Sequence, residues 1–96
     1  MKEKQINAIK KTLIEVAKRY GVKKAALFGS IVRGETTEGS DIDLLIEFEG
    51  KRSLLDLAGL KLELEELLGR KVDVLTYKSL HPLLREKILS EQKVIL

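Results

Sequence analysis

The 96-residue sequence has no cysteine, no tryptophan and a single proline. Without cysteine, the chain has no disulfide framework, no thiol chemistry and no cysteine-based zinc site. No apolar run is long enough to span a membrane, and the first residues lack the apolar core of a secretory signal. These absences lead us to expect a cytoplasmic protein without a membrane partner.

Aromatic residues and excess charge are also scarce. Two tyrosines and two phenylalanines offer little material for stacking nucleic-acid bases. Charged residues make up 34% of the chain, yet the formal net charge is only +3. Such a balance indicates a solvated surface and not a dedicated nucleic-acid binder, so direct nucleic-acid binding is not expected. With 44% hydrophobic residues, we expect one core and a single domain over residues 1–96.

The spacing of apolar residues predicts alternating helices and strands. The expected elements are a helix over 3–19, a strand over 25–28, a helical turn over 31–34, a polar loop over 35–39, a strand over 41–48, a helix over 54–68, a strand over 71–76, a helix within 79–90 and a short edge strand over 94–96. The order αβαβαβα(β) predicts an α/β fold of mixed α+β type, with helices packed on a mixed sheet of three or four strands.

The two longest expected strands are joined through the helix over 54–68. This connection is a natural right-handed βαβ crossover, which makes the strands 41–48 and 71–76 parallel neighbours. We therefore expect Asp73 to lie beside Asp41 and Asp43. For the connecting helix, the apolar pattern assigns its buried face to a set of residues that includes Leu54, Leu57, Ala58, Leu62 and Leu68.

The stretch from Leu27 to Phe48 carries the chemistry. Asp41 and Asp43 have the same parity along a strand, so their side chains share a face, about 7 Å apart. Two neighbouring carboxylates repel each other, and a hard divalent cation between them removes that cost. Upstream, Gly29-Ser30 joins the end of a strand to the start of a helix, where free backbone N–H groups suit a phosphate.

These motifs together resemble a known family. Gly29-Ser30, a ten-residue gap before Asp41 and Asp43, the pair Arg33-Gly34 and the later Val72-Asp73-Val74 resemble the DNA polymerase beta-type nucleotidyltransferase superfamily. The small size and the phrase ALFGSIVRGE…GSDIDLLI resemble its minimal nucleotidyltransferase (MNT) branch, and the resemblance covers most of the chain. Many MNT proteins are antitoxins that pair with HEPN-domain ribonuclease toxins.

The resemblance implies a role for each motif residue. Asp41 and Asp43 would be ligands of two Mg²⁺ ions, with Mn²⁺ as an alternative, and Asp73 would ligate the catalytic ion and help to deprotonate an attacking hydroxyl. Gly29 would let the backbone approach the phosphates closely. Ser30 would donate a hydrogen bond to the β- and γ-phosphates of the nucleotide.

Some of these residues have a second interpretation. Asp73 could be an exposed acid in a short strand. Gly29-Ser30 alone would be an ordinary strand-to-helix turn. Arg33 could neutralise phosphate or cap local carbonyl groups, and we list it with Gly29 and Ser30 as a candidate phosphate-binding residue.

The resemblance implies the transfer of a nucleoside monophosphate, AMP from the co-substrate ATP, to a hydroxyl group. The expected acceptor is a tyrosine of a HEPN-family toxin, so the protein would act as an antitoxin in a hetero-oligomer. A binding-only antitoxin without catalysis, and a stand-alone enzyme for a small-molecule hydroxyl, are the alternatives. The apolar run 94–96 and the last helix are the candidate partner surface, although the run could equally complete the core or an edge strand.

Overall fold

The computed structural model describes residues 2–37 and 39–96, so Glu38 of the predicted polar loop lies outside the described residues. The elements follow the order α1 (Glu3–Arg19), β1 (Val22–Phe28), α2 (Ser30–Arg33), β2 (Ile42–Phe48), α3 (Leu54–Leu68), β3 (Val72–Thr76), the 3₁₀ turn η1 (Tyr77–Ser79), α4 (Pro82–Glu91) and β4 (Lys93–Val94). The predicted bounds of α1 and α3 are confirmed. In the described part of the chain, no helix is long and apolar enough to cross a membrane.

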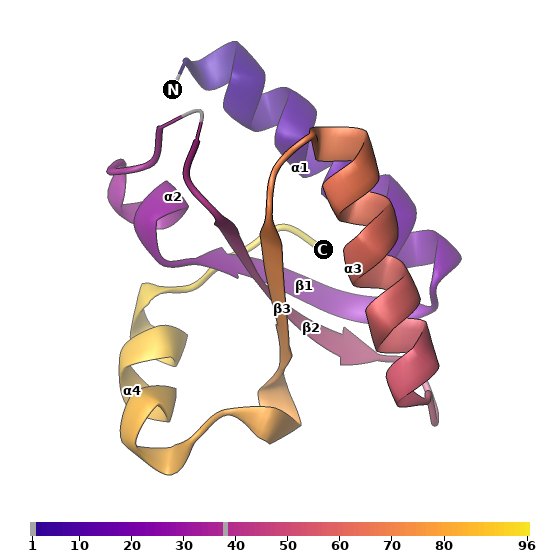
Figure 1. The fold of residues 1–96 in the computed structure, drawn as a ribbon. Helices are drawn as coiled ribbons and strands as arrows, with labels where there is room; N and C mark the ends of the chain where they lie inside the picture. Colours follow the sequence, from indigo (N-terminus) through magenta and orange to yellow (C-terminus); the bar gives the residue numbers. More distant parts are fainter. Residues whose placement is uncertain (1, 38) are drawn as a thin grey trace.

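The four strands form one mixed sheet in the order β3-β2-β1-β4 (Figure 1). β1 runs antiparallel to both β2 and β4, whereas β2 and β3 are parallel. Parallel strands need a long crossover, and α3 provides it. The predicted α/β fold with a mixed sheet is therefore confirmed, including the parallel pair on which the position of Asp73 depends.

Each face of the sheet has its own apolar cluster. In β2, the alternation of side chains sends Leu44 to one face and Leu45 to the other. The Leu44 face is covered by α1 and α3, which lie side by side in Figure 1 and contribute Leu13 and Leu60 among others. The Leu45 face packs against Leu80 and the apolar side of α4. Because both faces of β2 are covered, it reads in sequence as a nearly continuous apolar run.

The first strand is longer than predicted. It begins at Val22 and not at Ala25, so Lys23 and Lys24 lie inside β1. The preceding Gly21 has φ +78°, which ends α1 abruptly and lets the strand begin at the next residue. The Lys24 ammonium lies 4.8 Å from the centre of the Tyr77 ring, a cation–π contact between β1 and η1.

The predicted buried face of α3 is wrong in part, because Leu57 and Leu68 pack against the core as expected but Leu54 and Leu62 do not. Leu60 and Leu64 are the fully buried residues of this helix, whereas Leu54 and Leu62 are 82% and 65% exposed. Two acids of α3 are partly buried: Glu63 pairs with Arg19 at 2.7 Å, and Glu65 accepts the Val72 N–H at 3.0 Å. Leucine occurs in nearly every turn of α3, so the apolar pattern alone fits more than one face.

The C-terminal segment both covers the sheet and exposes apolar surface. Strand β4 (Lys93–Val94) pairs with β1 on the side opposite β2. Ile95 and Leu96 pack against the main core. On the other hand, Val94 is 53% exposed, and α4 exposes two leucines, Leu83 and Leu84, by 86% and 54%. The predicted edge strand and the predicted exposed apolar surface are therefore both present in this segment.

Candidate active site

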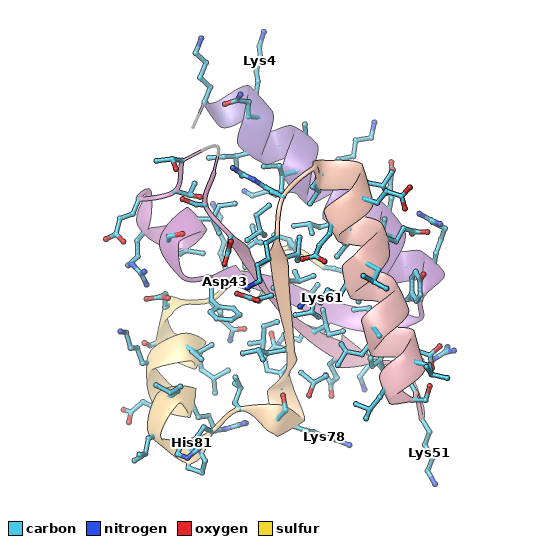
Figure 2. The ribbon with its side chains drawn as sticks, viewed as in Figure 1. Lys4, Asp43, Lys51, Lys61, Lys78 and His81 are labelled. Carbon is cyan, nitrogen blue, oxygen red and sulfur yellow. The ribbon has the colours of Figure 1, made fainter. Side chains whose placement is uncertain are left out.

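The central feature of the site is a pair of aspartates on neighbouring strands. Asp43 of β2 and Asp73 of β3 are register partners in the parallel pair, and the charge of Asp73 acts on the Asp43 carboxyl group. Asp43 has the parity of Leu45, so both point to the face on which α4 packs. Figure 2 shows Asp43 in the middle of the molecule, beside β3. The predicted proximity of Asp73 to Asp43 is confirmed.

The environment of Asp43 favours its protonated form. Partial burial is the main cause, and the neighbouring charges of Asp73 and Asp41 add to it, so that the pKa of Asp43 rises to about 6. The positive charge of Arg33 acts in the opposite direction and lowers this pKa. A carboxyl pKa raised by burial together with nearby like charges is typical of functional sites.

Gly29 lies directly against Asp43. Its φ of 76° and ψ of −151° belong to a backbone region that is essentially restricted to glycine. A Cβ at this position would also collide with the Asp43 carboxyl group. The register explains the closeness, because Phe28, the residue before Gly29, pairs with Asp43 across β1 and β2.

Ser30 begins α2, which is a single helical turn. The Gly29 carbonyl accepts the N–H groups of Val32 and Arg33 at 3.1 and 3.2 Å. The N–H groups of the first helical residues have no partner inside a helix. Within the described residues, the Ser30 hydroxyl has no recorded protein partner. Hydrogen-bonding groups that suit an anion are therefore present next to the Asp43 carboxyl.

The sequence predicts that Arg33 neutralises phosphate or caps local carbonyl groups. In the structure it pairs with two carboxylates. Its Nε donates to Glu35 at 3.0 Å, and its Nη1 lies 3.0 Å from both carboxylate oxygens of Glu91. Both acids raise the pKa of Arg33, that of Glu35 most. Its side chain is 42% exposed and its recorded partners are carboxylates, not local carbonyl groups.

Glu91 is the residue that reasoning from sequence missed. It is the last residue of α4, and its Oε1 accepts the Gly29 N–H at 2.8 Å. The hydrogen bond from Gly29, followed by those from Arg33, lowers the pKa of Glu91. Sixty-two positions separate Glu91 from Gly29, and no local pattern links a helix-end glutamate to a distant glycine, so only the folded chain reveals the contact.

The donor set fits a hard divalent cation in part. Carboxylate oxygens are the ligands that Mg²⁺ prefers, and it commonly takes one or two of them and completes its shell with phosphates and water. The Asp43–Asp73 pair provides that. Asp41 precedes β2 and is exposed, and residues 2–37 and 39–96 contain no group of three or more acids or histidines arranged to hold a metal. A site of three acids is thus not preformed there.

A cavity of about 530 Å³ lies at the other end of the parallel strands. Its lining includes Glu47 and Phe48 of β2, Thr76 of β3, and the turn residues Lys51 and Arg52. None of the candidate aspartates or phosphate-binding residues lines it. The geometry of Asp43, Asp73 and Gly29, and not the size of a cavity, therefore identifies the candidate active site.

The comparisons with known proteins agree with this geometry. The family model of the nucleotidyltransferase domain matches residues 9–95. The chain belongs to the nucleotidyltransferase family, in its minimal branch, and is a nucleotidyltransferase. It is 57% identical over 86 residues to a candidate protein adenylyltransferase of Methanocaldococcus jannaschii, covering 90% of this chain and 92% of that protein. It is 43% identical over 77 residues to the protein adenylyltransferase MntA of Thermococcus cleftensis, covering 80% and 78%.

Solved structures show the same fold. A candidate minimal nucleotidyltransferase has a TM-score of 0.83 and 43% identity, with 97% of this chain and 95% of that chain covered. A toxin–antitoxin structure with AMP-PNP has a TM-score of 0.80 at 20% identity, with 91% and 72% covered. An MNT antitoxin in complex with a tri-AMPylated HEPN toxin of Shewanella oneidensis has a TM-score of 0.74 at 17% identity, with 94% and 71% covered. The last two likenesses concern the fold alone.

Proposed function

We propose that this nucleotidyltransferase is a metal-dependent protein adenylyltransferase that transfers AMP from ATP to a hydroxyl group of a partner protein and releases pyrophosphate. The observation that carries the proposal is the Asp43–Asp73 pair lying against Gly29 at the start of α2. Carboxylates for a cation and free donors for phosphates thus meet at one point. The relatives at 57% and 43% identity, which are named as protein adenylyltransferases, support the same reaction class.

The aspartates would hold Mg²⁺, which neutralises phosphate charge and activates the attacking oxygen when it is bound. Asp43 and Asp73 would supply oxygens from adjacent strands, and Asp41, two residues before Asp43, would supply a third carboxylate. Burial and the neighbouring carboxylates raise the pKa of Asp43 to about 6. The group is therefore largely neutral near pH 5 and largely ionised near pH 7. Asp73 would take the proton of the acceptor hydroxyl.

The turn before α2 would hold the triphosphate. Without a side chain, Gly29 leaves room beside Asp43, so phosphate oxygens can approach the backbone and a cation together. The Ser30 hydroxyl and the first N–H groups of α2 would donate to these oxygens. Arg33 contributes positive charge beside the turn.

The partner that we propose is a HEPN-family toxin whose tyrosine accepts AMP, so that the transfer inactivates the toxin. The described residues contain few elements beyond those that build the nucleotide site, which favours an acceptor presented by a separate protein. The neighbouring structure of an MNT antitoxin with a tri-AMPylated HEPN toxin supports this class of partner. Leu83 and Leu84 offer exposed apolar surface on α4, the helix that packs on the Asp43 face.

Co-incubation tests the reaction directly. The protein, its co-expressed HEPN partner, Mg²⁺ and ATP labelled at the α-phosphate should yield a labelled partner, with a mass increase of whole AMP units. Asp43→Asn, which keeps the shape of the side chain, should abolish labelling, and chelation of Mg²⁺ should do the same. A stable complex that is never labelled would instead identify a binding-only antitoxin. Labelling of a small molecule without the partner would identify a stand-alone enzyme.

A further inference from the structure

Glu91 joins the end of the chain to the candidate phosphate turn. One carboxylate accepts from the Gly29 N–H at 2.8 Å and from Arg33 Nη1 at 3.0 Å. The Glu91 side chain is only 17% exposed. Immediately after it, β4 pairs with β1 at Ala26 and Leu27, and Leu96 exchanges backbone hydrogen bonds with Ala25. The segment that carries Glu91 is therefore fixed on β1 close to where that strand enters Gly29.

The Gly29 turn needs such an anchor. Its backbone conformation is one that other residues avoid, and it must remain beside the Asp43 carboxyl group. The single turn of α2 that follows is too short to hold a fixed orientation by its own hydrogen bonds. The partly buried Glu91 acceptor on the Gly29 N–H sets the plane of the peptide that leads into the turn.

The same carboxylate determines where Arg33 lies. With Glu35 on Nε and Glu91 on Nη1, the guanidinium group is held between two acids. In this position its charge reaches Asp43 and lowers the pKa of that aspartate. Among the residues that the structure describes, these two carboxylates engage the Nε and Nη1 donors and leave those of Nη2. Only part of the Arg33 guanidinium group remains for a phosphate.

We propose that Glu91 is a positioning residue of the nucleotide site: it fixes the Gly29-Ser30 turn and, through the ion pair with Arg33, the charge beside Asp43. This inference deepens the proposed function and rests on it for the identity of the bound nucleotide. It also makes Arg33 a partner of Glu91, in addition to its candidate role beside the phosphates. Because Glu91 occupies the Gly29 N–H, the Ser30 hydroxyl and the first N–H groups of α2 are the hydrogen-bond donors of this turn that could reach the triphosphate.

The opposite role makes an opposite prediction. A carboxylate on a backbone N–H could instead occupy the place of a phosphate and be displaced by it. Removing such a competing anion would tighten nucleotide binding, whereas removing a positioning residue weakens it. The partial burial of Glu91, its ion pair with Arg33 and its attachment through β4 all favour a carboxylate that stays in place.

Amide hydrogen exchange followed by NMR tests the anchor without any nucleotide. In Glu91→Ala, exchange at Gly29 should accelerate about tenfold, the scale of one lost hydrogen bond to a charged group, while Leu44 in β2 keeps its rate. Glu91→Gln should restore most of the protection, because its amide oxygen can still accept the N–H. Glu86→Ala removes an exposed acid from the same helix and serves as the control. Unchanged exchange at Gly29, or equal acceleration at Leu44, would overturn the proposal.

Calorimetry with Mg²⁺ and a non-hydrolysable ATP analogue tests the consequence for binding. Glu91→Ala should raise the Kd at least about tenfold, Glu91→Gln less, and Glu86→Ala not at all. If Glu91→Ala fails to fold, Glu91→Gln alone must still weaken binding measurably. An equal or lower Kd in the Glu91 variants contradicts the positioning role. If the wild-type protein binds no nucleotide, the proposed function fails, and the exchange rates at Gly29 still decide whether Glu91 holds the turn.

Discussion

At the scale of single residues, Asp43 has an unfavourable electrostatic environment for a charged carboxyl group. It is a carboxyl group placed beside two others and partly buried, and its pKa is raised to about 6. Folding does not require that arrangement, since like charges at close range destabilise the folded state. The cost is explained if a cation and the phosphates of a nucleotide complete the site.

The raised pKa predicts an unusual pH dependence of stability. The folded form of Asp43 binds a proton more tightly than the unfolded form, so its contribution to stability is fully present below the unfolded pKa of about 3.8 and is lost as the pH rises through about 6. Without metal, the wild-type Tm should therefore fall between pH 5 and pH 7. Asp43→Asn should remove most of this fall.

Thermal unfolding in a chelating buffer, at half-unit steps of pH, measures the effect. Glu66→Gln, an exposed acid of α3, is the control and should keep the wild-type slope. A wild-type Tm that rises steadily from pH 5 to pH 7, and does so equally in Asp43→Asn, would show that the carboxyl group is not perturbed in this way.

Gly29 gives a second prediction at this scale. Gly29→Ala forces a Cβ toward the Asp43 carboxyl group and puts alanine at φ 76°, so we expect a loss of about 1–3 kcal/mol in the free energy of unfolding. Gly39→Ala is the matched control, because a Cβ there meets no atom within 4 Å. Urea denaturation of both variants measures the difference. Equal stabilities would mean that the turn relaxes at little cost.

At the scale of elements, most of the fold was predictable because its local signals agree. The Gly residues that end α1 and α3, the Ser53 cap of α3 and the alternation in β2 all indicate the observed elements. The face of α3 was not predictable, because its leucines do not form one stripe. Which of them are buried depends on how α3 lies against α1 and the sheet, and that is tertiary information.

Paired substitutions in α3 test the observed face. Leu60 is fully buried, so Leu60→Ala should cost about 2–5 kcal/mol of unfolding free energy. Leu62 is 65% exposed, and Leu62→Ala should stay within about 0.5 kcal/mol of the wild type. Denaturant midpoints of the two variants provide the measurement. A larger loss for Leu62→Ala would restore the face that the sequence pattern favoured.

At the scale of the whole molecule, the candidate site combines a part that is local in sequence with a part that is not. Gly29, Asp41 and Asp43 lie within fifteen positions, and a recognisable spacing links them. Asp73 could be placed only by assuming a parallel crossover, which the register of β2 and β3 confirms. Glu91 could not be placed, since its contact depends on how α4 and β4 return to β1. Long-range polar contacts of this kind leave no periodic trace in a sequence.

The path of the C-terminal segment also decides where a partner could bind. It leaves Leu83 and Leu84 exposed on α4, whereas α3 exposes a second apolar surface that includes Leu55 at 83%. Because α4 packs on the Asp43 face and α3 on the opposite face, the α4 surface is the one of the two that lies on the same side of the sheet as the candidate site. An acceptor tyrosine has to reach that site, so α4 is the better docking surface for the HEPN partner.

A matched set of substitutions separates the two surfaces. Leu83→Asp and Leu84→Asp together should weaken co-purification with the HEPN partner by about tenfold or more, because a central apolar contact of an interface is lost. They should leave the Tm nearly unchanged, since both side chains are already exposed in the isolated chain. Leu55→Asp, on α3, should keep the complex and the transfer of AMP. If Leu55→Asp breaks the complex and the α4 variant does not, the partner binds the face away from Asp43. Its tyrosine could not reach the aspartates from there. Steric masking would then replace catalysis as the way in which the toxin is neutralised.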